Sequence, residues 1–165
     1  MKRADARQAF KSNGFTLLEM IAVIAILAIL LRIAVPALQE LVINQRVRGA
    51  TMDTLATLML ARSEAIKQGG NVSVTPASGT TNWSSGWRIV GTDGATVRTQ
   101  DAYSGVQVSA TISTGAASVV FDRTGRISGT ATMQIESASN AASYARRCVS
   151  VGLSGQPKST TGVCS

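Results

Sequence analysis

The order of apolar and polar residues divides the chain into stretches with different periods. Between Met20 and Leu31 every side chain is apolar. After Pro36, apolar residues recur at spacings of three, four and seven, which is the period of an amphipathic helix. These residues are Leu38, Leu41, Val42, Met52, Leu55, Met59 and Ile66. Good helix formers fill residues 56–68, and Gly69-Gly70 supplies a stop. The pattern predicts one long helix over residues 15–68, whose second half packs under a globular head.

From Asn71 onward the period of the pattern indicates strands instead of a helix. Short stretches of strand-forming residues occupy positions 71–75, 87–90, 96–100, 106–112, 118–121, 132–136 and 147–153. Gly, Ser and Thr separate these stretches, and Arg123-Thr124-Gly125-Arg126 is a tight-turn signal that returns the chain through Ile127. We therefore expect an α+β fold, in which about seven short strands form two small antiparallel sheets against the helix.

Charge changes the interpretation of the N-terminus. The 165-residue chain has a formal charge of +7, and residues 1–14 contribute +3 of it, through one acid and the four bases Lys2, Arg3, Arg7 and Lys11. A basic segment ahead of an apolar run is typical of a targeting leader. A secretory signal peptide is the ordinary alternative. Its cleavage needs small residues at the end of the run, where Arg32 and Pro36 intervene.

Residues 15–38 are long enough to cross a bilayer, because their 24 residues make about 36 Å of helix. Arg32 lies near the far end, from which a long side chain reaches the membrane interface. Glu19 lies one turn from the start. Either it reaches water among the headgroups, or it is buried with a cationic partner, since a lone charge in lipid costs about 2.5–3.5 kcal/mol. A newly exposed α-amino group at Phe15 of a neighbouring copy is such a partner.

The segment Gly14-Phe15-Thr16-Leu17-Leu18-Glu19 resembles the type III signal sequence of type IV pilins and type II secretion pseudopilins. The apolar run and Pro36, at position 22 counted from Phe15, continue the resemblance in register. The resemblance implies that a prepilin peptidase cuts after Gly14 and methylates the new amine of Phe15, and that Glu19 sets subunit register during assembly. It also implies a pilin-like fold, with a leader over residues 1–14, a transmembrane and filament-core helix over 15–38, an amphipathic helix half over 39–70 and a β-rich head over 71–165.

The second half of the chain is similar to GspH/FimT-type minor pilins. The similarity lies in residues 60–66, in Trp83 with Gly86-Trp87, and in Phe121-Asp122 with Gly125-Arg126. It implies a subunit at or near the tip of a pilus or pseudopilus, not the repeating shaft subunit. Some FimT proteins carry a Gly-Arg-x-Arg stretch that is proposed to grip DNA. Here the corresponding residues 155–158 read Gly-Gln-Pro-Lys, so that only the glycine and the final base match.

Two cysteines, Cys148 and Cys164, enclose fifteen residues rich in Ser, Gly and Thr. In an exported head a disulfide between them stabilises by about 3 kcal/mol and holds residues 149–163 as a fixed surface loop. The alternative is two free thiols. Trp83 and Trp87 suit the core of the head better than a ligand platform.

Basic residues near this loop are candidates for contact with double-stranded DNA: Arg123, Arg126, Arg146, Arg147 and Lys158. In a DNA-binding protein they form one basic patch, beside which Tyr144 stacks on a base. The alternative is a set of scattered, solvated bases. Arg46 and Arg48, on the helix, suit anionic lipid or a neighbouring subunit better than nucleic acid.

The inventory of side chains argues against catalysis. The sequence has no histidine, no CxxC pair, no nucleophile elbow and no phosphate-binding loop ahead of a helix, so we expect neither an enzyme nor a cofactor or metal.

Three functional hypotheses follow. The first is a minor type IV pilin, processed by prepilin peptidase, inserted once in the inner membrane with its head in the periplasm, and incorporated near the pilus tip to prime assembly. The second is a tip-located DNA receptor for natural transformation. The third is a minor pseudopilin of a type II secretion system. The expected partners are other pilins, prepilin peptidase, inner-membrane lipid and, for the second hypothesis, DNA.

Overall fold

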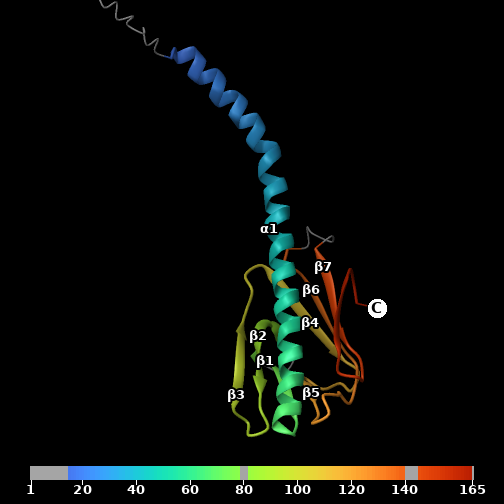
Figure 1. Ribbon diagram of the computed structural model, residues 1–165. Coiled ribbons are helices and arrows are strands. Elements are labelled where there is room, and N and C mark those ends of the chain that lie inside the picture. Colours follow the sequence, from blue (N-terminus) through green and yellow to red (C-terminus); the bar gives the residue numbers. More distant parts are fainter. Residues whose placement is uncertain (1–14, 79–81, 140–144, 165) are drawn as a thin grey trace, which may run out of the picture. The chain divides into compact units, whose positions relative to one another are not determined.

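The computed structural model of the 165-residue chain describes residues 15–78, 82–139 and 145–164. One long helix, α1 (Leu17–Gln68), precedes all the strands of the described residues (Figure 1). The strands are β1 (Val72–Ser78), β2 (Asn82–Val90), β3 (Thr96–Asp101), β4 (Val106–Ile112), β5 (Val119–Phe121), β6 (Ala131–Ser137), β7 (Arg146–Val151) and β8 (Pro157–Thr161). The chain forms two compact units, Met1–Leu38 and Gln39–Ser165, and α1 runs through both.

In the first unit, residues 17–38 are helical and every side chain from Phe15 to Leu38 is exposed. Pro36 lies inside the helix. A proline there removes one backbone hydrogen bond, yet the helix continues through it to Gln68. No residue of this segment belongs to a core within the described chain.

In the second unit, the helix buries a face made mostly of small and β-branched side chains, on which both sheets pack. These residues are Val47, Ala50, Thr51, Thr54, Thr57, Leu58, Ala61 and Ala65. The buried hydroxyls of Thr51 and Thr54 donate to the helix carbonyls of Val47 and Ala50, both at 2.7 Å, so that their burial leaves no hydrogen bond unmade. The helix ends where Gly69 takes a φ of 67° and the Gly70 N–H donates to the Ala65 carbonyl at 3.3 Å.

The strands form two four-stranded sheets, both antiparallel. One has the order β3-β2-β1-β5 and the other the order β4-β6-β7-β8. Ser84 of β2 links them, because its hydroxyl donates to the Val108 carbonyl of β4 at 3.1 Å and accepts from the Val108 N–H at 2.9 Å. The turn after β5 returns through a bridge between Phe121 and Ile127, as the sequence predicts.

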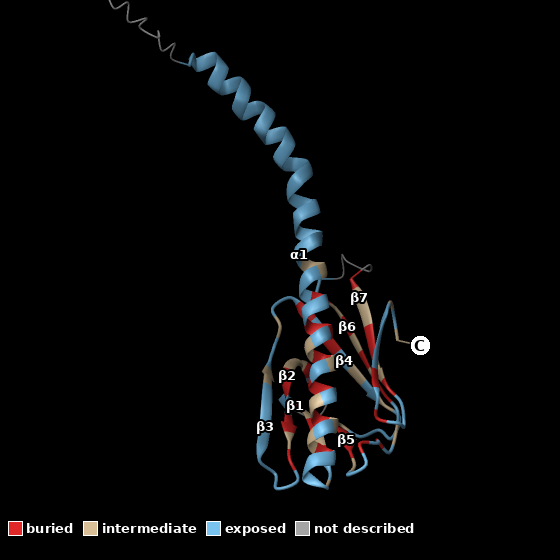
Figure 2. Cartoon of the chain, viewed as in Figure 1, coloured by how far each residue is buried: buried red, intermediate tan, exposed pale blue. Residues whose placement is uncertain are grey.

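The core of the second unit lies between the helix and the inner faces of the sheets (Figure 2). Trp83 and Trp87 are each 2% exposed, which confirms their prediction as core residues. The Trp87 indole N–H donates to the Thr57 hydroxyl at 3.2 Å. Tyr103 packs on Trp87, and its hydroxyl donates to Asp53 of α1, which fastens the β3–β4 connection to the helix.

Two sequence-based expectations need correction. Of the apolar helix residues expected to face the head, Leu55 packs partly against the core, whereas Met52, Met59 and Ile66 are 64%, 54% and 52% exposed. The face that the helix buries instead consists of three alanines and three threonines together with Val47 and Leu58. The fold also contains an eighth strand, β8, in the stretch expected to be a loop. Its residues after Pro157 are polar and all exposed, and backbone pairing with β7 holds this edge strand.

Candidate assembly site and basic surface

The first turn of α1 is a capping box. Thr16 precedes the helix, and its hydroxyl accepts from the Glu19 N–H at 3.2 Å. In return, Oε2 of Glu19 accepts from the Thr16 N–H at 3.2 Å and from the Thr16 hydroxyl at 3.3 Å. The pattern Thr16-x-x-Glu19 is visible in the sequence, although we predicted a different role for Glu19. Within one chain, therefore, Glu19 starts the helix on which it lies.

The capping box leaves part of the Glu19 carboxylate available. Thr16 donates both of its hydrogen bonds to Oε2 of Glu19, and within the described residues Oε1 of Glu19 accepts none. Glu19 is exposed, one turn from Phe15, so a cation from another chain has access to it. Gly14, the predicted cleavage residue, lies outside the described residues.

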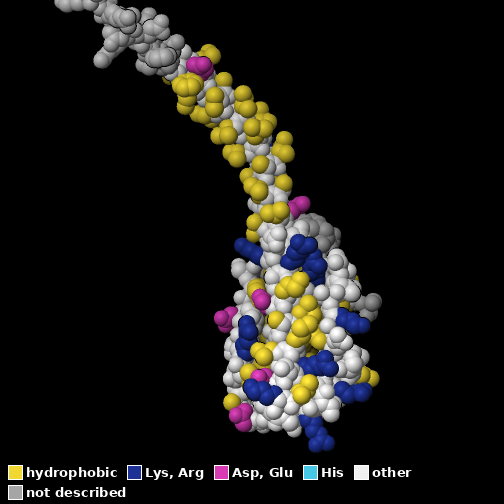
Figure 3. All heavy atoms as spheres, viewed as in Figure 1, with side chains coloured by type: hydrophobic (Ala, Val, Ile, Leu, Met, Phe, Trp, Pro, Cys, Tyr) yellow, Lys and Arg dark blue, Asp and Glu magenta, His cyan; other side chains and the backbone are white. Residues whose placement is uncertain are grey.

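Behind Glu19, every side chain from Met20 to Leu31 is apolar and exposed, and Figure 3 shows the apolar surface on one face of this segment. The described chain contains one helix that is long and apolar enough to cross a membrane, and its most apolar stretch has no buried residue. In water this surface is unfavourable by roughly 25 cal/mol for each Å² of apolar area left exposed. The segment therefore needs lipid or other helices around it.

The five basic candidates do not share one face of the second sheet. In an antiparallel pair, residues directly opposite each other point to the same side. Arg147 lies opposite the buried Ile135, so it is on the core-facing side, where its guanidinium donates to the Thr161 hydroxyl at 3.4 Å. Arg146 lies opposite Glu136, on the outer side, and pairs with that carboxylate at 3.0 Å.

The remaining three candidates lie toward the other end of β7. Lys158 is opposite Ser150 on the outer face, four residues along β7 from Arg146, which separates the two by about 13 Å of strand. Arg123 and Arg126 are exposed in the turn after β5. Asp122 shapes this turn by accepting from the Thr124 hydroxyl at 2.6 Å and from the Arg126 N–H at 3.1 Å. These hydrogen bonds lower the pKa of the Asp122 carboxyl, and the one from the Thr124 hydroxyl has the largest effect. Tyr144, the expected stacking residue, lies outside the described residues.

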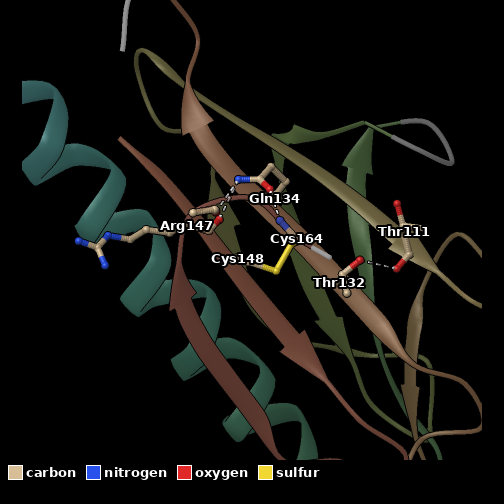
Figure 4. The surroundings of a disulfide bond; sticks show 7 residues. Thr111, Thr132, Gln134, Arg147, Cys148 and Cys164 are labelled. Carbon is tan, nitrogen blue, oxygen red and sulfur yellow. Dashed lines mark hydrogen bonds between the residues drawn. A yellow bond between two sulfur atoms is a disulfide. The ribbon is translucent and has the colours of Figure 1, made fainter. Parts of the chain in front are cut away.

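The predicted disulfide between Cys148 and Cys164 is present, with the two Cα atoms 5.0 Å apart. It holds the C-terminal residues on the outer face of the second sheet (Figure 4). Gln134 of β6 fixes the same residues, because its amide oxygen accepts from the Cys164 N–H at 2.8 Å. Its amide nitrogen donates to the carbonyls of Arg147 and Gly162, both at 3.3 Å. Sequence reasoning missed Gln134, since nothing local distinguishes it from any other outward-facing polar strand residue.

A long helix with an apolar first half, packed on two antiparallel sheets, defines the chain as pilin-like. Family models agree: residues 50–155 match "Type II transport protein GspH" and residues 10–34 match the prokaryotic N-terminal methylation motif. The chain belongs to the GspH family of minor type IV pilins and minor pseudopilins.

Solved structures show the same fold at low sequence identity. The type IV minor pilin FimU of Pseudomonas aeruginosa is 22% identical, with a TM-score of 0.57 over 69% of this chain and 87% of that one. The minor pseudopilin EpsH from the Type 2 Secretion System of Vibrio cholerae is 13% identical, with a TM-score of 0.57 over 70% of this chain and 97% of that one. No curated protein matches the sequence. The family and fold predicted from the sequence are thus confirmed.

Proposed function

We propose that this protein is a minor subunit of a type IV pilus, cut after Gly14 and methylated at Phe15. Residues 15–38 hold it in the inner membrane with the head in the periplasm. It then enters the filament near its tip and helps to prime assembly. One observation carries the proposal: the helix begins with an accessible carboxylate, Glu19, and continues as an apolar segment that buries nothing within the described chain.

The step that we assign to Glu19 is pairing with the amine of Phe15 on an adjacent subunit. Oε2 stays with Thr16 in the capping box, and Oε1 accepts from the neighbour's ammonium group. A charge surrounded by apolar helices is costly unless it is paired. The pair therefore favours the one axial register in which both groups meet. Because capping and pairing use different oxygens, a single residue can serve both.

Two substitutions of Glu19 separate pairing from capping. Glu19→Gln keeps a capping-box residue but removes the charge, whereas Glu19→Ala removes both. We expect both variants to insert in the membrane and both to be incorporated about tenfold less, since each lacks the charge-paired hydrogen bond. The measurement is the amount of the subunit in sheared filaments relative to the amount in the membrane.

A chain left uncut by substitution of Gly14 is the control, because it offers no free amine at Phe15. Normal incorporation of Glu19→Gln together with loss of Glu19→Ala would show that Glu19 acts through the helix start alone. Absence of the unsubstituted chain from filaments would overturn the proposed function itself.

A minor pseudopilin of a type II secretion system is the alternative, since FimU and EpsH share this fold. Deletion distinguishes them. Loss of surface pili with normal secretion supports the pilus role, and the reverse result supports the secretion role. DNA uptake has no specific support from the geometry, because Arg146 is paired with Glu136 and Arg147 lies on the other side of the sheet. A gel shift over a salt series tests it.

A further inference from the structure

The outer face of the second sheet carries a groove of about 260 Å³ that crosses β6, β7 and β8. Three of its lining residues, Thr132, Ser150 and Lys158, lie directly opposite one another on these strands, so that their side chains point to the same side. They form one row across the sheet, on strands that are about 4.8 Å apart. Ser154 and Gln156, from the turn between β7 and β8, line the same groove.

The side chains of this groove form hydrogen bonds and carry a single charge. The described residues that line it include four hydroxyl groups, the amide of Gln156 and the ammonium group of Lys158, but neither a carboxylate nor an aromatic ring. The ion pairs of the described chain do not include Lys158, and Glu136, an acid on the same sheet face, already pairs with Arg146. The groove therefore offers one positive charge beside a row of hydroxyls.

Contacts outside the groove fix its walls. The turn between β7 and β8 is closed by the Gly155 N–H, which donates to the Gly152 carbonyl at 2.8 Å. Gly155 also lies against the Gly125 carbonyl, with no room for a side chain between them. The disulfide between Cys148 and Cys164 and the pairing with β7 hold β8 in place. A site whose walls are fixed before binding loses little conformational entropy when a ligand enters.

We propose that this groove binds an acidic sugar unit of a polysaccharide, whose carboxylate pairs with Lys158 and whose hydroxyls bond to Ser150 and Thr132. Sugar hydroxyls both donate and accept, as do the Ser and Thr hydroxyls and the Gln156 amide. The ammonium group adds a charge-assisted hydrogen bond to the carboxylate. The inference goes beyond the proposed function, since it uses no residue assigned to assembly.

The size of the groove suits one sugar ring of a longer chain. Its volume is smaller than the roughly 300–1,000 Å³ of pockets that enclose drug-sized ligands. Thr111 of β4 lies opposite Thr132, so the row of hydroxyls continues beyond the groove (Figure 4). The neighbouring units of a polysaccharide can therefore lie along this row.

Nucleic acid fits the groove less well. Duplex DNA is held by several cations on several phosphates, whereas Lys158 is the one cation among the described lining residues. Unpaired bases stack on aromatic side chains, and the described lining has none. The donors and acceptors of the groove match a hydroxylated ligand with one carboxylate.

The experiment titrates the full-length chain, in detergent micelles, with short oligomers of galacturonate, glucuronate and mannuronate, followed by calorimetry. We expect at least one to bind, and the same oligomer with its carboxylates reduced to alcohols to bind about tenfold more weakly or worse. Lys158→Gln should weaken binding of the acidic oligomer by a similar factor. Thr132→Val with Ser150→Ala keeps the charge and should also weaken it, because two hydroxyls are lost. Arg88→Gln, which removes an exposed charge on β2, is the matched control and should bind as the unsubstituted chain does.

Four results would overturn the inference: no binding of any acidic oligomer, equal binding of the reduced oligomer, unchanged binding in Lys158→Gln, or unchanged binding in the double variant. Inorganic phosphate and a duplex oligonucleotide are tested as competitors, and displacement by either at equal concentration would also contradict it. Binding through one charge should depend weakly on salt, whereas nucleic acid held through several phosphates is released steeply.

Incorporation into filaments separates this inference from the proposed function. Lys158→Gln should be found in sheared filaments as often as the unsubstituted chain. Reduced incorporation of this variant would show that Lys158 serves a contact between subunits, which overturns the sugar site and leaves the pilin role standing. Absence of the unsubstituted chain from filaments would overturn the pilin role and leave the binding measurement unaffected.

Discussion

At the scale of single residues, two glycines determine how the ends of the sheets meet. Gly155, in the turn between β7 and β8, has a φ of 72°. A Cβ there would lie 1.8 Å from the carbonyl oxygen of Gly125, which itself has a φ of 74°. The turn after β5 and the turn after β7 thus touch through backbone alone. In sequence, Gly155 is the glycine that matches the FimT stretch; in the structure it has a packing role.

Gly155→Ala is expected to lower the free energy of unfolding by about 2–4 kcal/mol, because it combines a left-handed backbone with a backbone clash. The measurement is denaturant unfolding of the full-length chain in detergent micelles, followed by the fluorescence of the buried tryptophans. Gly152→Ala in the same turn is the control, since a Cβ there meets nothing within 4 Å, and should change stability by less than about 0.5 kcal/mol. Equal stability of the two variants would contradict the packing role.

At the scale of elements, Tyr103 connects the β3–β4 segment to α1. Burial raises the pKa of the Tyr103 hydroxyl above its usual value of 10.0, and the hydrogen bond donated to Asp53 raises it further. The folded state therefore favours the neutral phenol. This stabilisation is complete below the unfolded pKa of about 10 and is lost as the pH rises from there through the higher folded pKa.

Tyr103→Phe tests this contact through its pH dependence. The variant lacks the titrating hydroxyl, so the difference in unfolding free energy between the original chain and the variant should shrink from about pH 9 to about pH 11. The measurement is a series of denaturant titrations across this range. If the difference in unfolding free energy does not change with pH, the protonation state of the Tyr103 hydroxyl does not affect stability, and the prediction is wrong.

At the scale of the whole molecule, all the burial within the described residues lies in the second unit, after Leu38. The first buried helix residue is Val47, and every side chain from Phe15 to Leu38 is exposed. The head is thus stabilised by its own core, and the apolar segment by surroundings outside the chain. This division suits a subunit that passes from membrane to filament without refolding its head.

Residues 39–165, produced alone, should therefore fold. The denaturant concentration at which half of this fragment is unfolded should equal that for the head of the full-length chain. We expect the two unfolding free energies to agree within about 0.5 kcal/mol, since residues 15–38 are all exposed. The measurement compares denaturant unfolding of the soluble fragment with that of the full-length chain in micelles. A clearly less stable fragment would show that the apolar segment supports the head.

The elements and their order follow from local pattern, which is why they could be predicted. The helix from the apolar run to Gly69-Gly70, the strands with clear alternation and the turn at Arg123–Arg126 are all determined by near neighbours in the chain. The start of the assembly site is local too, because Thr16 and Glu19 are one turn apart. The family was predictable for the same reason, since its N-terminal motif is contiguous.

Long-range packing decided what the local pattern left open. Periodicity showed that α1 has an apolar stripe, but the head covers the side that carries alanines and threonines together with Val47 and Leu58. The eighth strand needed β7 to pair with, and Gln134 needed the returning C-terminus. The faces occupied by Arg146 and Arg147 followed from the pairing of β6 with β7. The sequence by itself determined the class of protein and its apolar N-terminal helix. The tertiary structure alone decided which surfaces of the described residues stay exposed, because burial depends on contacts between residues far apart in the chain.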